Sequence, residues 1–187
     1  MSAPPALPRL LVLTDRGQLP LGRSLVATVA ECVEAGLTHV VLRELDLTDD
    51  RRAALAHALA GVGATVVAAH RPLPATIGTH LPARAPGAGL GRSCHSRAEV
   101  LAAAEQGAAY ATLGPIGPSA SKPGYGPSLP LTDLAGHPIP VYALGGVTPD
   151  NAGAVLAAGA HGVAAMGVVM RAASPATVVD RLLRATR

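Results

Sequence analysis

Aromatic side chains are almost absent from this sequence of 187 residues, which holds three tyrosines and no phenylalanine or tryptophan. Proteins that bind single-stranded nucleic acids stack the bases on aromatic rings, so this composition disfavours such a function. Charge is scarce too: charged residues make up 14% of the chain, and the net charge of +3 comes with no run of lysines or arginines. The sequence therefore indicates no nucleic-acid partner.

Cysteine pairs and metal-binding spacings are also missing. Cys32 and Cys94 form no CxxC motif, and the histidines show neither HxH nor HExxH spacing, so neither a disulfide framework nor a zinc site is expected. No apolar run reaches the ~18 residues of a membrane span. Residues 1–8, which we expect to form a flexible tail, lack the charged and apolar regions of a secretory leader. We therefore expect a cytoplasmic protein without membrane association.

Short apolar runs alternate with helical patterns along the whole chain. Candidate strands cover residues 10–14, 39–42, 65–69, 77–81, 89–93, 110–113, 140–144 and 162–166. Candidate helices cover residues 21–35, a segment capped by Asp49 or Asp50 that runs to residue 60, a segment capped by Ser96 that runs to residue 106, and segments that begin at Thr148 and Ser174. Uniformly apolar strands are buried on both faces, and their alternation with helices predicts a parallel sheet covered by helices.

The number of strands predicts an α/β fold of the (β/α)8 TIM-barrel type, with one domain over residues 1–187. The barrel is expected to be small, because the region around the third and fourth βα units is shortened. Residues 72–86 are rich in proline there and show no helical period.

Functional groups of such barrels follow the carboxyl ends of the strands. Gly145, Gly146 and Val147 come directly after the seventh expected strand, and Gly167 and Val168 follow the last one. Backbone N–H groups in such turns, unobstructed by a Cβ atom, suit a phosphate group. The alternative is that these glycines only make tight turns.

Two further groups are candidates for anion binding. Ser119, Ser121 and Lys122 place two hydroxyls and an ammonium within four residues, which suits a phosphate or diphosphate clamp, although the composition by itself slightly favours a solvated, disordered loop. Arg43 follows the second strand, where a guanidinium suits an oxyanion. The alternative for Arg43 is a structural pair with Glu44.

The histidines supply the candidate acid or base. His70 and His95 follow strands, and His80 is a third candidate, because imidazole titrates near neutral pH. The remaining histidines are expected to be structural or at the surface. Cys94 precedes His95 like a nucleophile beside its base, but adjacent residues of an extended segment point apart.

Six segments in a fixed order resemble the thiamine phosphate synthase/TenI family of (β/α)8 barrels. They are Leu-Thr-Asp-Arg at 13–16, Val-Val-Leu-Arg-Glu at 40–44, Gly-Arg-Ser-Cys-His-Ser at 91–96, the Gly-Pro-Ile segment through lysine at 114–122, Ala-Leu-Gly-Gly-Val at 143–147, and Ala-Gly-Ala-His-Gly-Val-Ala at 158–164. Together they cover nearly the whole chain. The resemblance implies a role in thiamin biosynthesis, with a small-molecule thiazole phosphate as the ligand.

The resemblance also implies roles for individual residues. The thiazole phosphate site matches at Gly145, Gly146, Gly167 and Val168, and the phosphate-binding loop matches at Ser119, Ser121 and Lys122. Arg43 matches a ligand of the substrate's diphosphate, and Ser93 matches a polar residue in the wall of the substrate site.

The family's synthases join a pyrimidine diphosphate to thiazole phosphate with the help of Mg²⁺, and this chain departs from them. Ala69-His70-Arg71 and residues 80–84 stand where the synthases carry the carboxylates that bind magnesium. Mg²⁺ requires hard oxygen ligands, which imidazole and guanidinium cannot replace. Breaking the bond to diphosphate without that charge stabilisation should be badly impaired.

TenI-type members lack the same ligands and act as thiazole tautomerases, moving a proton on a carboxythiazole phosphate without a metal. The resemblance therefore implies a tautomerase that needs no cofactor. TenI enzymes can carry a catalytic histidine where this chain has Pro115, so His70 or His95 would have to act as the acid or base. The alternatives are a Mg²⁺-dependent thiamine phosphate synthase and a non-catalytic accessory protein that binds thiazole phosphate. The oligomeric state is left open, a homodimer included.

Overall fold

The structure, a computed structural model, describes residues 7–118 and 127–187, and its eight strands form a closed parallel barrel. The strands are β1 (Leu10–Leu13), β2 (His39–Leu42), β3 (Thr65–Ala69), β4 (Thr79–Leu81), β5 (Gly91–Cys94), β6 (Tyr110–Leu113), β7 (Val141–Leu144) and β8 (Gly162–Ala165). Each strand pairs with the next, and β8 pairs with β1 to close the sheet. The predicted TIM barrel is confirmed.

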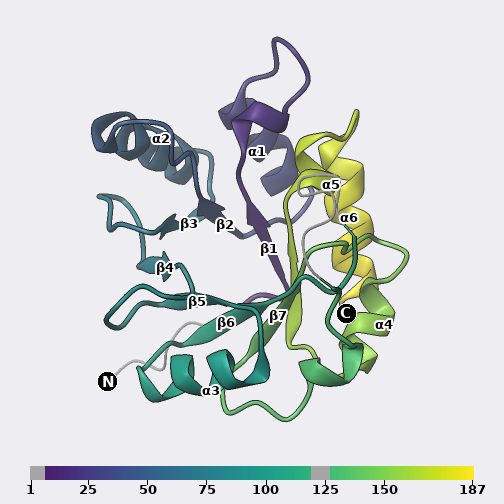
Figure 1. Cartoon of the computed structure of the whole chain (residues 1–187). Helices are drawn as coiled ribbons and strands as arrows, with labels where there is room; N and C mark the ends of the chain where they lie inside the picture. Colours follow the sequence, from purple (N-terminus) through teal and green to yellow (C-terminus); the bar gives the residue numbers. More distant parts are fainter. Residues whose placement is uncertain (1–6, 119–126) are drawn as a thin grey trace.

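Helices surround most of the barrel (Figure 1). They are η1 (Arg16–Gln18), α1 (Leu25–Glu34), α2 (Asp49–Gly61), α3 (Arg97–Glu105), η2 (Leu131–Leu134), α4 (Ala152–Ala157), α5 (Gly167–Met170) and α6 (Pro175–Ala185). Residues 70–78 and 82–90, all of them described, contain no helix, so the side of the barrel between α2 and α3 lacks a helical cover. The predicted shortening of the third and fourth units is confirmed.

The sheet nevertheless stays closed across this region. Ala69 of β3 pairs with His80 of β4, and Leu81 of β4 pairs with Arg92 of β5. Arg92 is buried and donates hydrogen bonds to the carbonyl oxygens of residues 82, 85 and 87, so it holds the loop between β4 and β5 in the place of a helix.

The predicted start of the first helix and the predicted N-cap of the second are wrong. The first helix begins at Leu25 and not near residue 21, because the Ser24 Oγ accepts the Ala27 N–H at 3.4 Å. Thr48, and neither of the two following aspartates, caps α2 with its Oγ1. In both cases the side chain that accepts a first-turn N–H sets the start of the helix.

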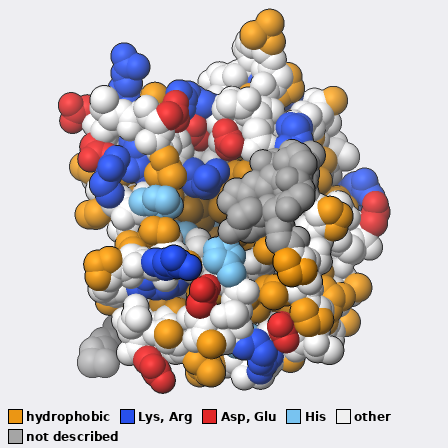
Figure 2. Space-filling view, in the orientation of Figure 1, with side chains coloured by type: hydrophobic (Ala, Val, Ile, Leu, Met, Phe, Trp, Pro, Cys, Tyr) orange, Lys and Arg blue, Asp and Glu red, His pale blue; other side chains and the backbone are white. Residues whose placement is uncertain are grey.

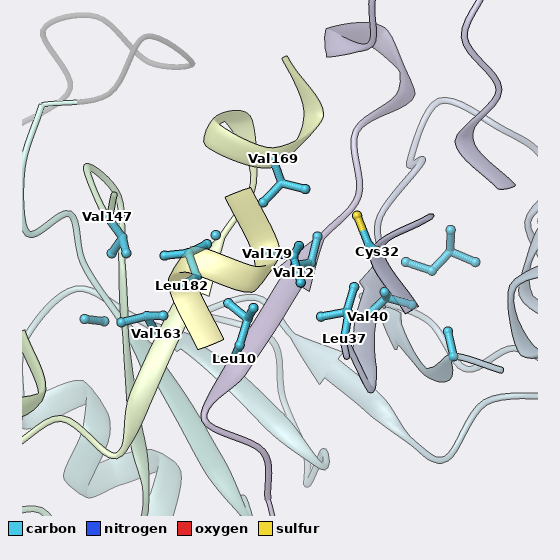
Figure 3. Close-up of a cluster of buried hydrophobic side chains, with 14 of the residues drawn as sticks. Leu10, Val12, Cys32, Leu37, Val40, Val147, Val163, Val169, Val179 and Leu182 are labelled. Carbon is cyan, nitrogen blue, oxygen red and sulfur yellow. The ribbon is translucent and has the colours of Figure 1, made fainter. Parts of the chain in front are cut away.

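Alternating strand residues build two apolar layers. Leu10 and Val12 of β1 point outward and pack with Val179 and Leu182 of α6 (Figure 3). Leu11 and the other inward-facing residues form a second cluster, which consists of Leu11, Leu13, Val41, Val67, Ala69, Tyr110, Tyr142 and Ala164. The inward-facing side chains therefore fill the interior of the barrel below the carboxyl ends of the strands.

The amino-terminal end of the barrel is closed by polar contacts. The Tyr142 hydroxyl donates to the Pro8 carbonyl at 2.5 Å, and a His161 ring nitrogen lies 3.3 Å from the Leu7 carbonyl oxygen. Residues 7 and 8 of the predicted tail are therefore fixed against the barrel. Among the described residues, no helix is both long enough and apolar enough to cross a membrane.

Candidate active site

A cavity of about 580 Å³ opens at the carboxyl ends of the strands. Its described lining includes the side chains of Arg43, His70, Ser93, His95, Thr112 and Arg171 and the loops at residues 114–118, 144–148 and 164–168. Figure 2 shows histidine and basic side chains gathered near the middle of the face that it presents. The predicted candidates Arg43, His70, Ser93 and His95 thus line one cavity.

The glycines after β7 adopt a backbone conformation that residues with a side chain disfavour. Gly145 and Gly146 have φ angles of +85° and +73°, and a Cβ atom on Gly146 would lie 2.7 Å from the backbone of Gly117. The loop after β7 therefore packs directly on the loop after β6. The N–H groups of residues 145–147 donate to no described group, so a ligand in the cavity can accept hydrogen bonds from them.

The turn after β8 adds two more N–H groups to the same cavity. Helix α5 begins at Gly167, directly after β8, so the N–H groups of Gly167 and Val168 have no preceding helical turn to bond to. A Cβ atom on Gly167 would lie 2.4 Å from the Arg171 guanidinium, which rests against this turn. The two turns predicted to bind phosphate do line one cavity, together with a cation.

The segment between β7 and α4 differs from its prediction. Helix α4 begins at Ala152 and not at Thr148, and in the turn before it the Thr148 N–H donates to the Asn151 Oδ1 at 2.8 Å. The Asn151 side chain also donates to the Gly146 carbonyl at 2.8 Å. Asn151 thereby holds the glycine turn while its N–H groups stay open to the cavity.

Arg43 lies on the cavity wall and does not pair with Glu44. Its Nη1 lies 3.1 Å from the Met166 sulfur and 4.0 Å from an Asp15 carboxylate oxygen. Glu44 is buried, and its carboxylate accepts the backbone N–H of Arg16 at 3.1 Å and the Arg16 guanidinium at 3.0 Å. The predicted alternative of an Arg43–Glu44 pair is therefore wrong, and the Arg43 guanidinium reaches the cavity.

His70 stands beside three cations at the end of β3. Its backbone has a φ angle of +67°, and its N–H donates to the His80 carbonyl at 2.8 Å. Burial lowers the pKa of His70, and the charges of Arg43, Arg52 and Arg71 lower it further. A neutral imidazole that faces the cavity suits a general base.

His95 faces the same cavity from the end of β5. Its Nδ1 lies 2.9 Å from the Gly114 carbonyl oxygen, and its backbone N–H donates to a Glu99 carboxylate oxygen at 2.6 Å. In the neutral ring the carbonyl accepts the Nδ1–H, which puts the lone pair on Nε2. The backbone contacts thus fix one tautomer of this ring.

His80 takes a different role from the one considered for it. It lies inside β4, and its ring bonds the Tyr110 hydroxyl at 3.1 Å and the Ser93 Oγ at 2.9 Å. Burial lowers the pKa of His80 to about 3, so its ring stays neutral. Ser93 itself lies within β5 and not after it, which sets its hydroxyl on the floor of the cavity.

Cys94 is no nucleophile, because burial raises the pKa of its thiol to about 12. Ser119, Ser121 and Lys122 lie outside the described residues, so their predicted contact with phosphate stays a prediction.

The described residues of the cavity do not fit a magnesium ion. Its described lining contains no aspartate or glutamate, and histidine, arginine and hydroxyl groups stand there instead. Among residues 7–118 and 127–187, no group of three or more histidine, cysteine, aspartate or glutamate side chains could hold a metal ion. Mg²⁺ prefers carboxylate oxygens, which the described lining of this cavity does not supply.

One residue that positions the site was missed by the sequence reasoning. Arg52 of α2 is fully buried and donates to the carbonyl oxygens of Leu42 at 3.4 Å, Arg43 at 3.0 Å and Ala69 at 2.6 Å. It thereby ties together the ends of β2 and β3, which carry Arg43 and His70. Its spacing from the buried residues Ala56 and Leu59 places it on the inner face of α2, and that spacing could have revealed it.

Comparison with known proteins shows which family this chain belongs to. The family model for thiamine monophosphate synthase matches residues 79–169. A protein of Geobacter sulfurreducens named "Putative thiamine-phosphate synthase" is 36% identical over 191 residues, which cover 89% of this chain and 88% of that protein. This chain belongs to the thiamine phosphate synthase/TenI family.

Other known proteins are similar to this chain in sequence or in fold. The thiamine-phosphate synthase of Geobacillus kaustophilus is 41% identical over 104 residues, which cover 52% of this chain and 47% of that protein. The solved structure of thiamine phosphate pyrophosphorylase from Pyrococcus furiosus has a TM-score of 0.81 at 25% identity and covers 95% of each chain. A geranylgeranylglyceryl phosphate synthase of Thermoplasma acidophilum, with a TM-score of 0.74 at 13% identity, shares the fold.

Proposed function

We propose that this thiamine phosphate synthase/TenI family member binds a phosphorylated thiazole at the carboxyl end of its barrel and shifts a proton on the ring without a metal. The phosphate would lie against the open N–H groups of residues 145–147 and of Gly167 and Val168. The observation that carries this proposal is that these turns share one cavity with His70 and His95, while no described residue of its lining is a carboxylate.

The proposed reaction needs a base that removes a proton at one ring position and an acid that returns a proton at another. His70 is suited to the first task, because its lowered pKa keeps it neutral near pH 7. The Arg43 guanidinium lies in the same cavity and would stabilise negative charge that develops on the ring as the proton leaves. His95, held by Gly114, is the second group able to carry the proton.

A second candidate is thiamine phosphate synthase, and the names of the relatives favour it. The Geobacter, Geobacillus and Pyrococcus proteins are all named for the synthase reaction, and none is named as a tautomerase. In that case Arg43 and Arg171 would have to offset the charge of the departing diphosphate, since the described lining supplies no carboxylate for Mg²⁺. The third candidate, an accessory protein, needs only the anion-binding turns.

One pair of assays separates these candidates. The purified protein is incubated with the carboxythiazole phosphate tautomer in the presence of EDTA, and isomerisation is followed by NMR. We expect turnover that EDTA does not reduce, and a loss of at least about 100-fold in His70→Gln or His95→Gln. His57→Gln is the matched control, because His57 is exposed on α2 and does not line the cavity.

Pyrophosphate release from the pyrimidine diphosphate and thiazole phosphate, dependent on Mg²⁺ and without isomerisation, would establish the synthase reaction instead. Binding of thiazole phosphate without either reaction would leave the accessory role. No binding at all would refute the proposed ligand.

A further inference from the structure

The floor of the cavity is built from two hydroxyl side chains on neighbouring strands. Ser93 of β5 and Thr112 of β6 are register partners in a parallel pair, so their side chains stand side by side on the same face of the sheet. Both residues line the cavity. Because they lie within strands, they are deeper in the barrel than the glycines, which follow the strand ends.

The Thr112 hydroxyl is buried without a hydrogen-bond partner among the described residues. Thr112 is 1% exposed, and its Oγ1 is one of the few buried polar atoms without a partner. The other buried threonines of the described chain are all bonded. Thr14 accepts the Arg43 N–H at 3.0 Å, Thr28 donates to the Ser24 carbonyl at 2.9 Å, and Thr186 donates to the Leu182 carbonyl at 3.0 Å.

An unpartnered buried hydroxyl costs stability that a valine of the same shape would not cost. Because Thr112 lines the cavity, a group that enters the cavity is a candidate partner for this hydroxyl.

The orientation of the neighbouring Ser93 hydroxyl is set by its hydrogen bond to the His80 ring. The neutral His80 ring carries one N–H and one acceptor nitrogen, and it bonds Tyr110 on one side and Ser93 on the other. Tyr110 is buried with no other described partner, so its O–H proton is used only if it donates to the His80 Nδ1. The His80 Nε2–H then donates to the Ser93 Oγ, which leaves the Ser93 O–H proton for the cavity.

We propose that Thr112 and Ser93 together hold a hydrogen-bond acceptor of the bound molecule, such as a carboxylate or ring nitrogen, while its phosphate occupies the glycine turns. Thr112 is then a specificity-determining residue, and His80 and Tyr110 are positioning residues that aim the Ser93 proton. The inference rests on the proposed function, because it concerns the part of the phosphorylated ligand that lies beyond the phosphate. A ligand that carries a phosphate but no such acceptor gains nothing from this floor.

The experiment compares two probes on the parent protein and on the variants Thr112→Val, Thr112→Ser and Thr186→Val. The probes are carboxythiazole phosphate and a simple alkyl phosphate, and their dissociation constants are measured by calorimetry or competition. In Thr112→Val we expect carboxythiazole phosphate to bind at least about tenfold more weakly and the alkyl phosphate to bind unchanged. Thr112→Ser, which keeps the hydroxyl, should stay within about threefold of the parent protein for both probes.

Thermal unfolding supplies a readout that does not depend on the ligand. The midpoint of Thr112→Val should equal or exceed that of the parent protein, because no bond to the protein is lost. Thr186→Val is the matched control with the opposite pattern: its hydroxyl is bonded, so the midpoint should fall while both affinities stay the same.

Three results would overturn the inference. If Thr112→Val binds both probes as the parent does, the floor does not recognise the ligand, although the proposed function stands. If Thr112→Val weakens both probes equally and lowers the midpoint, Thr112 has a structural role. If the parent binds neither probe, the proposed function and this inference fail together.

Discussion

Replacing Gly146 with alanine is the most direct test of the proposed phosphate site at the glycine turns. The residue has a φ angle of +73°, where an L-residue with a Cβ atom is disfavoured by roughly 1–2 kcal/mol. The new Cβ atom would also lie 2.7 Å from the Cα and carbonyl carbon of Gly117 and 3.0 Å from its oxygen. These atoms belong to backbone and cannot rotate away, so the loop after β6 or the loop after β7 has to move.

Gly107→Ala separates the free-energy cost of the positive φ angle from the cost of the close contact with Gly117. Gly107 has a φ angle of +83°, and a Cβ atom there would meet nothing within 4 Å. This variant therefore has the backbone cost alone, about 1 kcal/mol, which corresponds to roughly 2–4 °C in the melting temperature of a protein of this size. Gly146→Ala has the same cost plus the displacement of a loop, so we expect about 2–3 kcal/mol in total.

Binding should separate the two variants further. Displacement of the glycine turn moves the N–H groups of residues 145–147, so Gly146→Ala should bind thiazole phosphate at least about tenfold more weakly. Gly107→Ala lies at the end of α3 and should bind it unchanged. Gly146→Asp should abolish binding, because it sets a carboxylate against the phosphate.

Calorimetric titration with thiazole phosphate and thermal unfolding of all three variants provide the measurements. The reasoning is refuted if Gly146→Ala is no less stable than Gly107→Ala and binds the phosphate as tightly.

Two further predictions concern the groups that support the site. Folding should weaken as the pH falls below about 6.5, by up to about 1.4 kcal/mol per pH unit, because the unfolded chain protonates His80 while burial keeps its pKa in the folded protein near 3. The free energy of unfolding, measured with urea at several values between about pH 7 and pH 4, should depend less steeply on pH in His80→Gln than in the parent protein. An equally steep dependence in both proteins would contradict this origin. Arg52→Met should lower the free energy of unfolding by about 3 kcal/mol, because it removes the hydrogen bonds of a buried guanidinium to three carbonyl oxygens at the ends of β2 and β3. Thermal unfolding checks this loss against Arg51→Ala, an exposed neighbour that should change stability by no more than about 0.5 kcal/mol, and equal losses would refute the role of Arg52.

Local patterns were enough to predict the order of the barrel strands. Apolar runs bounded by glycine and proline need only a few residues to be recognised, and the predicted strands at 65–69 and 110–113 have the same bounds in the structure. The shortened third and fourth units were also visible as a proline-rich gap. Helix starts were less certain, because several polar residues in a row could cap α2 and the cap is the one whose oxygen reaches a first-turn N–H.

By itself, the sequence determined the (β/α)8 architecture, the family motifs and the two glycine turns. Only the tertiary structure decided that Glu44 pairs with Arg16, that His80 faces the lumen while His70 faces the cavity, and that Thr112 lies beside Ser93. These facts depend on strand register and on which face of the closed sheet each side chain occupies. Register is set by pairing between segments far apart in the chain, and a shift of one residue would turn every side chain of a strand to the opposite face.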